Sequence, residues 1–256
     1  MLAPPGTIER RFVIAQALRA LAPGGRFTVL APKDKGGARL GGELRGFGCD
    51  VAEASRRHHR ICHTQRPADP AGLDDAIREG APRLDDALRL WTEPGIFSWN
   101  RVDPGSALLL QHLPLLSGQG ADLGCGIGIL AHAVLASAKV TALHLIDIDR
   151  RAIDVSRRNV ADGRARFVWG DALLPDSLPP GLDFVVMNPP FHQAGSEDQS
   201  LGQRFIARAA ALLRKGGMCW LTANRHLPYE AVLQPLFKRI ALKADSGGYK
   251  IYEAQK

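Results

Sequence analysis

Short apolar runs and segments with helical spacing alternate along the C-terminal half of the chain. The apolar runs predict strands at 139–147, 164–171, 182–191 and 218–224, and the segment 119–126 predicts a strand that passes into a glycine loop. A double proline closes the run at 182–191. Because proline cannot continue a central strand, we expect a rigid turn at that point.

Between these runs, apolar residues stand three and four positions apart, as in helices that bury one face. The predicted helices are 127–137, 150–163, 203–217 and 228–239. Two short strands near 240–244 and 248–254 follow as a hairpin. Strands separated by crossover helices predict an α/β fold, doubly wound around a mostly parallel, seven-stranded Rossmann-like sheet with an antiparallel C-terminal hairpin.

The start of the chain contains a weak repeat of its end. An Ala/Leu helix, two glycines and a strand occur at 15–32 and again at 208–224. A helix ending at Phe47 then parallels one ending at Phe237, and the segment 49–63 parallels the final hairpin. Since internal repeats bear directly on the fold, we predict a truncated, degenerate copy of the same fold in front of the complete one.

The predicted domains are a partial copy at 1–66, an acidic linker at 67–100 and a complete domain at 101–256. We expect residues 26–31 to form the strand equivalent to 218–223. Because no equivalent neighbour is expected before residue 26, that strand would present an open edge. We expect it to pack on the complete domain, to pair with a second protomer or to stay poorly ordered. We expect these 256 residues to lack the front half of the copy, with the alternative that a longer natural chain supplies it, and the sequence leaves the oligomeric state open.

Charge is unevenly distributed along the chain. Residues 1–66 hold 12 Lys and Arg against 5 Asp and Glu, so they account for a net charge of +7, equal to that of the whole chain. A clustered basic surface suits a polyanionic partner such as nucleic acid, although a merely solvated basic face would have the same composition. No apolar run approaches the ~20 residues of a membrane span. Together with the lack of a secretion-signal pattern at the N-terminus, this leads us to expect a cytoplasmic protein without membrane contact.

Four cysteines are present, and none forms a C-x-x-C pair. Cys49 and Cys62 stand near His58, His59 and His63, a group that could suggest a metal site. The spacing is looser than in structural zinc sites, so we favour buried thiols and basic loop residues. We predict no metal.

A glycine loop follows the first predicted strand of the complete domain. Gly124, Gly126 and Gly128 allow tight turns and close approach of the backbone to a ligand. Such loops also mark dinucleotide folds. Asp122 at its head would disfavour a pyrophosphate and favour the amino group of a methionine moiety, which indicates S-adenosylmethionine.

Acidic residues also end the next two predicted strands. Asp147 closes the second strand and can accept hydrogen bonds from both ribose hydroxyls. Asp149 is the rival for that role, but its position before a helix favours an N-cap. Asp171 ends the third strand and is expected near the adenine amino group. Ligands of open α/β sheets bind at these strand ends.

The sharpest signal is Asn188-Pro189-Pro190-Phe191, at the end of the fourth strand. The prolines fix a turn that exposes the Asn188 side chain and the Pro189 carbonyl. These two acceptors can bind both hydrogens of a planar amino group. Phe191 offers a face on which a base can stack.

Residues 96–256 resemble the ribosomal RNA guanine-N2 methyltransferases, whose chains pair two methyltransferase-like domains. The resemblance is carried by 95–110 (GIFSWNRVDPGSALLL), 122–128 (DLGCGIG), 188–192 (NPPFH) and 223–229 (ANRHLPY), and it extends upstream through 24–37. It implies that the C-terminal domain binds S-adenosylmethionine and methylates N2 of a guanine in ribosomal RNA, free or within a ribosomal subunit. The 16S RNA of the small subunit is the leading substrate. It also implies that the N-terminal copy helps to hold RNA.

The resemblance and the motifs together give the expected site. The expected catalytic residues are Asn188, Pro189, Pro190 and Phe191. The expected cofactor-binding residues are Asp122, Gly124, Cys125, Gly126, Gly128, Asp147, Ile148, Asp171, Ala172 and Asn188. Two alternatives stay open from the sequence: methylation of a protein glutamine amide or adenine N6, and a non-catalytic RNA-binding or assembly factor.

Overall fold

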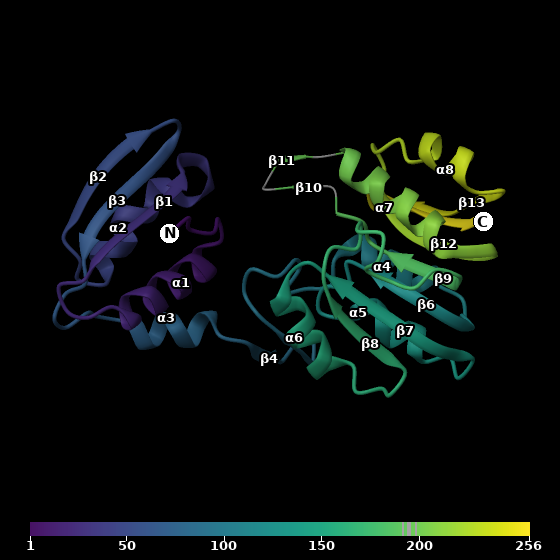
Figure 1. The fold of residues 1–256 in the computed structure, drawn as a ribbon, viewed down its shortest axis with the longest axis horizontal. Coiled ribbons are helices and arrows are strands. Elements are labelled where there is room, and N and C mark those ends of the chain that lie inside the picture. Colours follow the sequence, from purple (N-terminus) through teal and green to yellow (C-terminus); the bar gives the residue numbers. More distant parts are fainter. Residues whose placement is uncertain (191, 194–195, 198) are drawn as a thin grey trace. The chain divides into compact units, whose positions relative to one another are not determined.

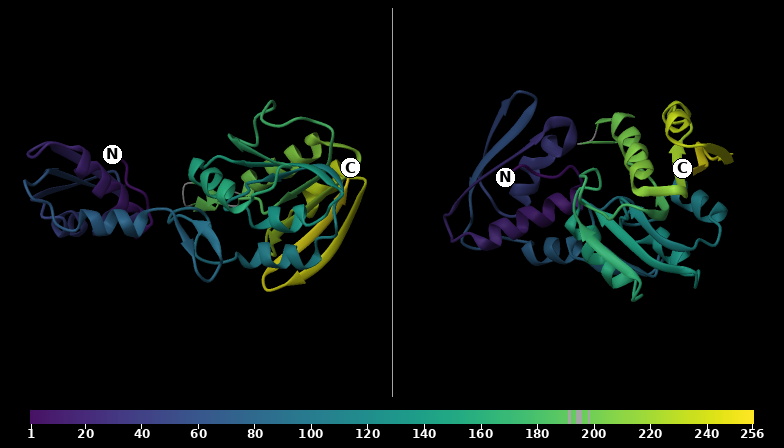
Figure 2. Two further views of the ribbon diagram at one scale, coloured as in Figure 1. Left: turned by 90° about the horizontal axis from the view of Figure 1, so that it is seen from below. Right: turned by 45° about the vertical axis from the view of Figure 1, so that its right-hand side comes forward.

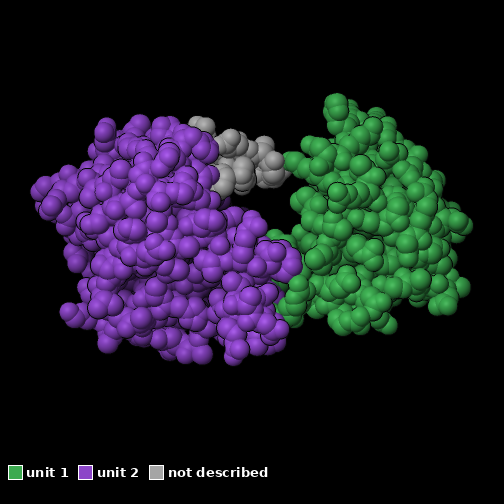
Figure 3. Space-filling model, turned by 180° about the vertical axis from the view of Figure 1, so that it is seen from behind, with its two compact units in different colours: residues 1–83, 93–95 green, residues 84–92, 96–256 purple. Residues whose placement is uncertain are grey.

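The computed structural model describes residues 1–190, 192–193, 196–197 and 199–256. The chain forms two compact units (Figure 3). Unit 1 comprises Met1–Arg83 with Glu93–Gly95, and unit 2 comprises Leu84–Thr92 with Ile96–Lys256. Within the described ranges, no helix has the length and apolar character that a membrane crossing requires.

Unit 2 is built around a seven-stranded sheet of order β13-β14-β12-β9-β6-β7-β8 (Figure 1). Its strands are β6 (Gly118–Leu123), β7 (Val140–Asp147), β8 (Ala165–Trp169), β9 (Leu182–Met187), β12 (Leu213–Asn224), β13 (Arg239–Ser246) and β14 (Tyr249–Gln255). The strands β6, β7, β8, β9 and β12 run parallel, and β14 is antiparallel to both of its neighbours. The predicted doubly wound sheet with a closing hairpin is confirmed.

Helices cover both faces of this sheet (Figures 1 and 2). They are α4 (Pro104–His112), α5 (Ile129–Leu135), α6 (Arg150–Asn159), α7 (Gln199–Leu212) and α8 (Glu230–Leu236). Alternation along β9 makes the two layers: Val185 and Met187 pack with α7 and α8, while Phe184 and Val186 pack with α4, α5 and α6. A strand buried on both faces needs apolar residues at every position, as the sequence of β9 has.

All four predicted helices are present, but their ends differ from the predictions by up to five residues, most of all at α7. The helix expected at 203–217 ends at Leu212, because Leu213 already pairs with Leu182 on β9. The Gly216 amide then donates to the carbonyl of the C-terminal residue Lys256. The basic, glycine-rich stretch that resembled a helix end is therefore the entry to β12.

Unit 1 is a smaller α/β unit with the sheet order β1-β3-β2. Its elements are α1 (Thr7–Ala20), β1 (Arg26–Pro32), the π-helical turn η1 (Lys33–Gly37), α2 (Ala38–Gly46), β2 (Val51–Arg56), β3 (His59–Gln65) and α3 (Leu73–Gly80). Its core contains Ile14 and Leu18 of α1, Val29 of β1, and Leu40 and Leu44 of α2, all without solvent exposure.

Unit 1 repeats the end of unit 2, as the sequence predicts. The order β1-β3-β2 matches β12-β14-β13, with antiparallel pairing throughout. The helices before each hairpin end at equivalent positions, because Phe47 is the C-cap of α2 and Phe237 that of α8.

The expectation of an open edge on β1 is wrong at one point. Leu2 forms a parallel bridge with Leu30. The Ala3 amide donates to the Leu30 carbonyl at 2.8 Å, and the Leu30 amide donates to the Met1 carbonyl at 2.9 Å. β9 likewise runs parallel to β12. The first three residues therefore stand where unit 2 has the full strand β9, and they supply hydrogen-bond partners to part of the edge of β1.

The segment expected to be a linker, 67–100, contains regular structure. It holds α3, and the short strands β4 (Arg83–Asp85) and β5 (Leu90–Thr92), which pair with each other. The Asn159 side chain of α6 accepts from the Trp91 amide at 2.6 Å and donates to the Trp91 carbonyl at 2.9 Å, so it fixes β5 on unit 2.

A last pair of short strands, β10 (His192–Gln193) and β11 (Ser196–Glu197), lies between β9 and α7.

Candidate active site

The glycine loop turns the chain sharply between β6 and α5. Gly124, Gly126 and Gly128 all have positive φ, at 75°, 54° and 86°. A Cβ on Gly128 would lie 3.1 Å from a methyl of Val160, so this position needs glycine for space as well as for backbone conformation. The Gly124 amide donates to the Ile146 carbonyl at 2.9 Å, which ties the loop to the end of β7.

Asp122 is a buried carboxylate beneath this loop. Its side chain is 0% exposed, and neither oxygen has a hydrogen-bond partner among the described residues. Burial, and secondarily the charge of Asp147, raises the pKa of Asp122 to about 8. A buried, unpartnered carboxylate is costly in the protein alone and matches a ligand that brings a cation.

Asp147 lies at the end of β7 and braces the glycine loop. Its carboxylate accepts from the Gly126 amide and from the Asp149 amide, both at 2.9 Å. Burial raises the pKa of Asp147, and those two backbone donors oppose the shift. Asp149 is the N-cap of α6 through the Arg151 amide, as expected.

Next to Asp147, the Ile148 side chain is 72% exposed. The Trp169 indole, at the end of β8, donates to the Ile148 carbonyl at 3.1 Å. The two apolar side chains thus stand at neighbouring strand ends, because Asp147 pairs with Trp169 in the sheet.

The other expected cofactor residues differ in burial. Ala172 and Cys125 are buried, and burial raises the pKa of the Cys125 thiol. Asp171 is half-buried, two residues beyond β8, where its carboxylate accepts from the Leu173 amide at 2.9 Å. Its remaining acceptor capacity is available to a ligand.

Strand register brings these positions to one edge of the sheet. Leu123 pairs with Ile146 on one side and with Met187 on the other. The glycine loop, the Asp147 turn and Asn188 therefore emerge side by side at the carboxyl ends of β6, β7 and β9. Open α/β sheets bind ligands at this edge.

Asn188 is half-buried and held by two residues that the sequence motifs did not single out. Its amide nitrogen donates to Asp103 Oδ2 at 2.8 Å and to Ser106 Oγ at 2.9 Å. Pro189 is buried and Pro190 half-buried. The expected stacking residue Phe191 lies outside the described residues.

A signal for Asp103 was present in the sequence. Asp103 precedes Pro104 and stands three residues before Ser106, which is the pattern of a helix N-cap with proline at the first helical position. That pattern predicts the start of α4 but not the contact with Asn188, which is 85 residues away.

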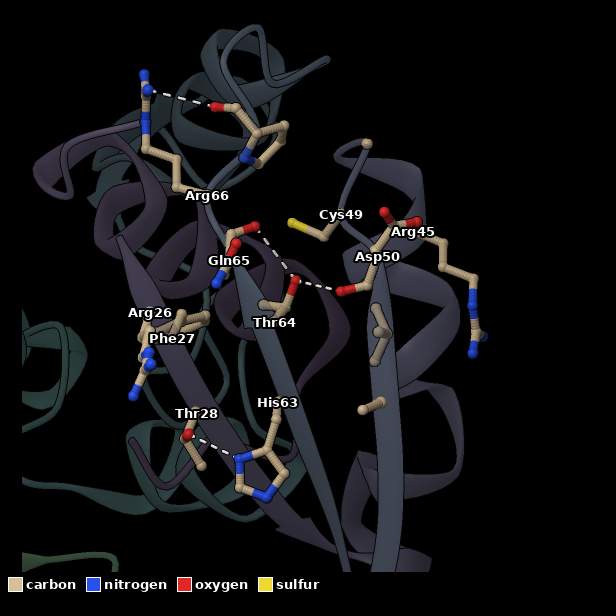
Figure 4. A pocket seen from close by; sticks show the side chains of 14 residues that line it. Arg26, Phe27, Thr28, Arg45, Cys49, Asp50, His63, Thr64, Gln65 and Arg66 are labelled. Carbon is tan, nitrogen blue, oxygen red and sulfur yellow. Dashed lines mark hydrogen bonds between the residues drawn. The ribbon is translucent and has the colours of Figure 1, made fainter. Parts of the chain in front are cut away.

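A separate hollow of about 800 Å³ lies in unit 1 (Figure 4). None of the sequence-predicted site residues lines it. Its charged residues are Arg26, Arg45, Arg66 and Asp50, and Thr28 bonds to His63 across its floor at 2.9 Å. Within the described part of the chain, no three His, Cys, Asp or Glu side chains gather as metal ligands would.

Comparison with known proteins gives the family. Residues 87–253 match the family model of the methyltransferase small domain. The ribosomal RNA small subunit methyltransferase C of Pseudomonas paraeruginosa is 33% identical, over 98% of this chain and 77% of its own length. The protein of the same name from Shewanella loihica is 29% identical over 96% of this chain and 73% of its own.

Among solved structures, the T. thermophilus 16S rRNA N2 G1207 methyltransferase, in complex with AdoMet and guanosine, superimposes with a TM-score of 0.81. It is 25% identical, and the match covers 100% of this chain and 71% of that one. The chain therefore belongs to the methyltransferase small domain family, among the ribosomal RNA small subunit methyltransferase C proteins.

Proposed function

We propose that this protein transfers a methyl group from S-adenosylmethionine to the exocyclic N2 of a guanine in the RNA of the small ribosomal subunit. The observation that carries the proposal is the amide of Asn188, fixed at the end of β9 beside a glycine loop and a buried, unpartnered carboxylate. Relatives of the same name and the guanosine-bound T. thermophilus structure support the choice of substrate. Such an enzyme works in the cytoplasm, where ribosomes are assembled.

The residues at the strand ends fit S-adenosylmethionine. Asp122 would bind the ammonium group of its methionine part, for which the protein alone offers no partner. Asp147 would accept from the ribose hydroxyls, and Ile148 would cover the adenine. Asp171 and Ala172 would meet the adenine edge, while Gly124, Cys125, Gly126 and Gly128 would pass their backbone beneath the cofactor.

The cofactor supplies a methyl group that is already activated, so the protein needs little acid–base chemistry. Asn188 Oδ1 and the Pro189 carbonyl would accept the two hydrogens of the guanine amino group. These bonds would draw the nitrogen lone pair out of conjugation with the ring and hold it in position for transfer. Formation of the N–C bond would leave a neutral thioether in place of the sulfonium, and one amino proton would pass to solvent. Rate then comes mainly from positioning. Pro190 would keep the turn rigid, and Phe191 would stack on the base.

The basic face of unit 1 would contact the RNA backbone. We define this face as Arg26, Thr28 and His63 on the sheet, with Arg56 and Arg57 at the β2–β3 turn. These side chains are exposed. Arginines on an exposed sheet bind phosphates without reading sequence, and each contact adds to the salt dependence of binding.

Methyl transfer from labelled cofactor to small ribosomal subunits tests the proposal, with the modified base mapped. The subunits should come from a strain that lacks the gene. We expect one guanine to gain the label and Asn188→Ala to abolish most of the transfer while cofactor affinity stays within a few-fold. Label on an adenine or on a protein glutamine would refute the assigned substrate, and near-normal turnover of Asn188→Ala would refute the mechanism.

Filter binding of the same RNA over a range of salt concentrations tests the basic face. Arg26→Ala should weaken binding and reduce the slope of log K against log salt by ~0.7–0.9 for each phosphate that the variant no longer neutralises. The matched control is Arg78→Ala on α3, which removes an exposed arginine of unit 1 that pairs with Asp75. Equal effects of the two substitutions would contradict a role for the face.

A further inference from the structure

The segment Val102–Ser106 brings two acceptors to Asn188 from the first turn of α4. Asp103 is the N-cap of that helix, and its Oδ2 accepts from the Ser106 amide at 2.9 Å. The same oxygen accepts from Asn188 Nδ2 at 2.8 Å, and Ser106 Oγ lies 2.9 Å from that nitrogen. Both hydrogens of the Asn188 amide are therefore engaged by α4.

Chemistry alone decides which way the Asn188 amide faces. An ionised carboxylate can only accept hydrogen bonds, whereas an amide carries two donors on nitrogen and acceptors only on oxygen. A rotated amide would place two acceptor oxygens 2.8 Å apart, in a site where Asp103 is only 8% exposed and water screens little. The nitrogen must face Asp103, so Oδ1 must face away from it.

The first turn of α4 is held tightly enough to act as a fixed support. A Cβ on Gly105 would lie 2.7 Å from the Tyr249 ring and 3.0 Å from Thr222 Oγ1, so the helix lies directly against β12 and β14. Burial, and then the charge of Asp103, raises the pKa of Tyr249, which agrees with that close packing. Backbone and side chain at this turn thus have little freedom to move.

We propose that Asp103 and Ser106 are positioning residues for methyl transfer, which hold the Asn188 amide so that its oxygen faces the acceptor amino group. The inference rests on the proposed function only in that an amino group accepts the methyl group. It holds for any such amino group, because guanine, adenine and glutamine acceptors need the same oxygen. Without the support of α4, Asn188 would sample both amide orientations, and only one of them is productive.

A double-mutant cycle between Asp103→Ala and Asn188→Ala tests the proposal. Asp103→Ala should lower kcat by about 10- to 100-fold, or ~1.4–2.7 kcal/mol, with KM for RNA and affinity for the cofactor within about three-fold. In the Asn188→Ala background the same substitution should change kcat by less than about three-fold, because it acts through Asn188. An equal fall of kcat in both backgrounds would overturn the proposal.

Two further variants separate positioning from helix capping. Ser106→Ala keeps the backbone amide that Asp103 caps and removes only one acceptor, so kcat should fall several-fold while the melting temperature changes little. Asp103→Asn keeps an acceptor oxygen for both bonds and a good N-cap, so it should restore most of the kcat lost in Asp103→Ala. If the kcat of Asp103→Asn is no higher than that of Asp103→Ala, the positioning role of Asp103 is refuted.

A readout without activity distinguishes this inference from the proposed function. The side-chain amide protons of Asn188, assigned by their loss in Asn188→Ala, should exchange slowly in the native protein. In Asp103→Ala they should exchange at least ten-fold faster. Unchanged exchange would refute the support by α4 even if the enzyme is active, whereas slow exchange in an enzyme that leaves ribosomal RNA unmodified would refute the substrate alone.

Discussion

Asp122→Asn should make the protein more stable at high pH while it destroys cofactor binding. The native carboxylate is buried without a partner among the described residues, and burial raises its pKa from 3.8 to about 8. In the unfolded chain it ionises near its ordinary pKa. Between pH 4 and pH 8 the folded state therefore holds a proton that the unfolded state has lost, so stability falls as pH rises.

The shift sets the size of the effect. Each pKa unit corresponds to about 1.4 kcal/mol. A pKa raised from 3.8 to about 8 therefore lowers the free energy of unfolding by up to ~6 kcal/mol above pH 8, and by ~4 kcal/mol at pH 7. Asparagine has the same shape and no charge, but it leaves amide hydrogens unbonded at a cost of ~1–3 kcal/mol. The variant should be less stable than the native protein near pH 4 and more stable at pH 8.5.

Denaturant unfolding from pH 5 to pH 8.5 measures the difference in stability. Titration calorimetry at pH 7, in two buffers of different ionisation enthalpy, measures protons released on cofactor binding. The native protein should release about 0.9 proton, because a group with a pKa of about 8 is mostly protonated at pH 7 and must ionise to bind an ammonium. The variant should release almost none and bind far more weakly.

If the free energy of unfolding changes with pH equally in the native protein and in Asp122→Asn, the raised pKa of the buried Asp122 is refuted. Retained cofactor affinity in the variant would refute the ammonium contact, whatever the stability shows. Substitution of Asp183, a half-buried aspartate that bonds to Arg214 and whose pKa is lowered, serves as the control. Asp183→Asn should lower stability most above pH 4, whereas Asp122→Asn should raise stability at high pH.

Three further changes should each act on one part of the molecule. Asp147→Ala should weaken cofactor binding by ~1.5–3 kcal/mol in calorimetry, because it removes the ribose acceptor and releases the Gly126 amide; unchanged affinity would misplace the ribose. Gly128→Ala should lower the free energy of unfolding in urea by ~1–2 kcal/mol, because alanine is strained at the positive φ of this residue. An unchanged free energy of unfolding would contradict that reason. Arg10→Met should lower the stability of unit 1, measured by amide hydrogen exchange in β1, by ~3–5 kcal/mol, because it leaves the buried Glu43 carboxylate without its partner. The double variant Arg10→Met, Glu43→Leu should recover much of that stability.

Local patterns predicted the elements that make the site. The strands of unit 2, the order of its closing hairpin and the repeat in unit 1 follow from apolar runs, glycine stops and the double proline, which act over a few residues. Asp122 could be placed beneath the loop for the same reason, since it ends an apolar strand. Its lack of a partner could not, because that depends on every side chain around it.

The contacts that complete the site join distant parts of the sequence. Asp103 meets Asn188 across 85 positions, and the Asn159 side chain binds β5 across 68. Residues 83–92 looked like part of an acidic linker because β4 and β5 are only three residues long, and β5 is fixed by its contacts with α6. Segments this short give no period from which to infer such docking.

The two copies of the half-fold differ at the turn that carries the double proline. Pro4-Pro5 follows the bridge of Leu2 to β1 just as Pro189-Pro190 follows β9, with an alanine in place of Asn188. In unit 1 the buried Arg10 guanidinium donates to the Pro4 and Pro5 carbonyls at 3.2 and 2.7 Å, so the acceptors that a substrate would need are filled. In unit 2 the equivalent place on α7 is Gly202, where any Cβ would meet the Tyr229 hydroxyl, and no arginine can reach the turn from there. The two turns therefore differ at two positions: alanine replaces the asparagine in unit 1, and Arg10 supplies donors to the Pro4 and Pro5 carbonyls where α7 has only Gly202.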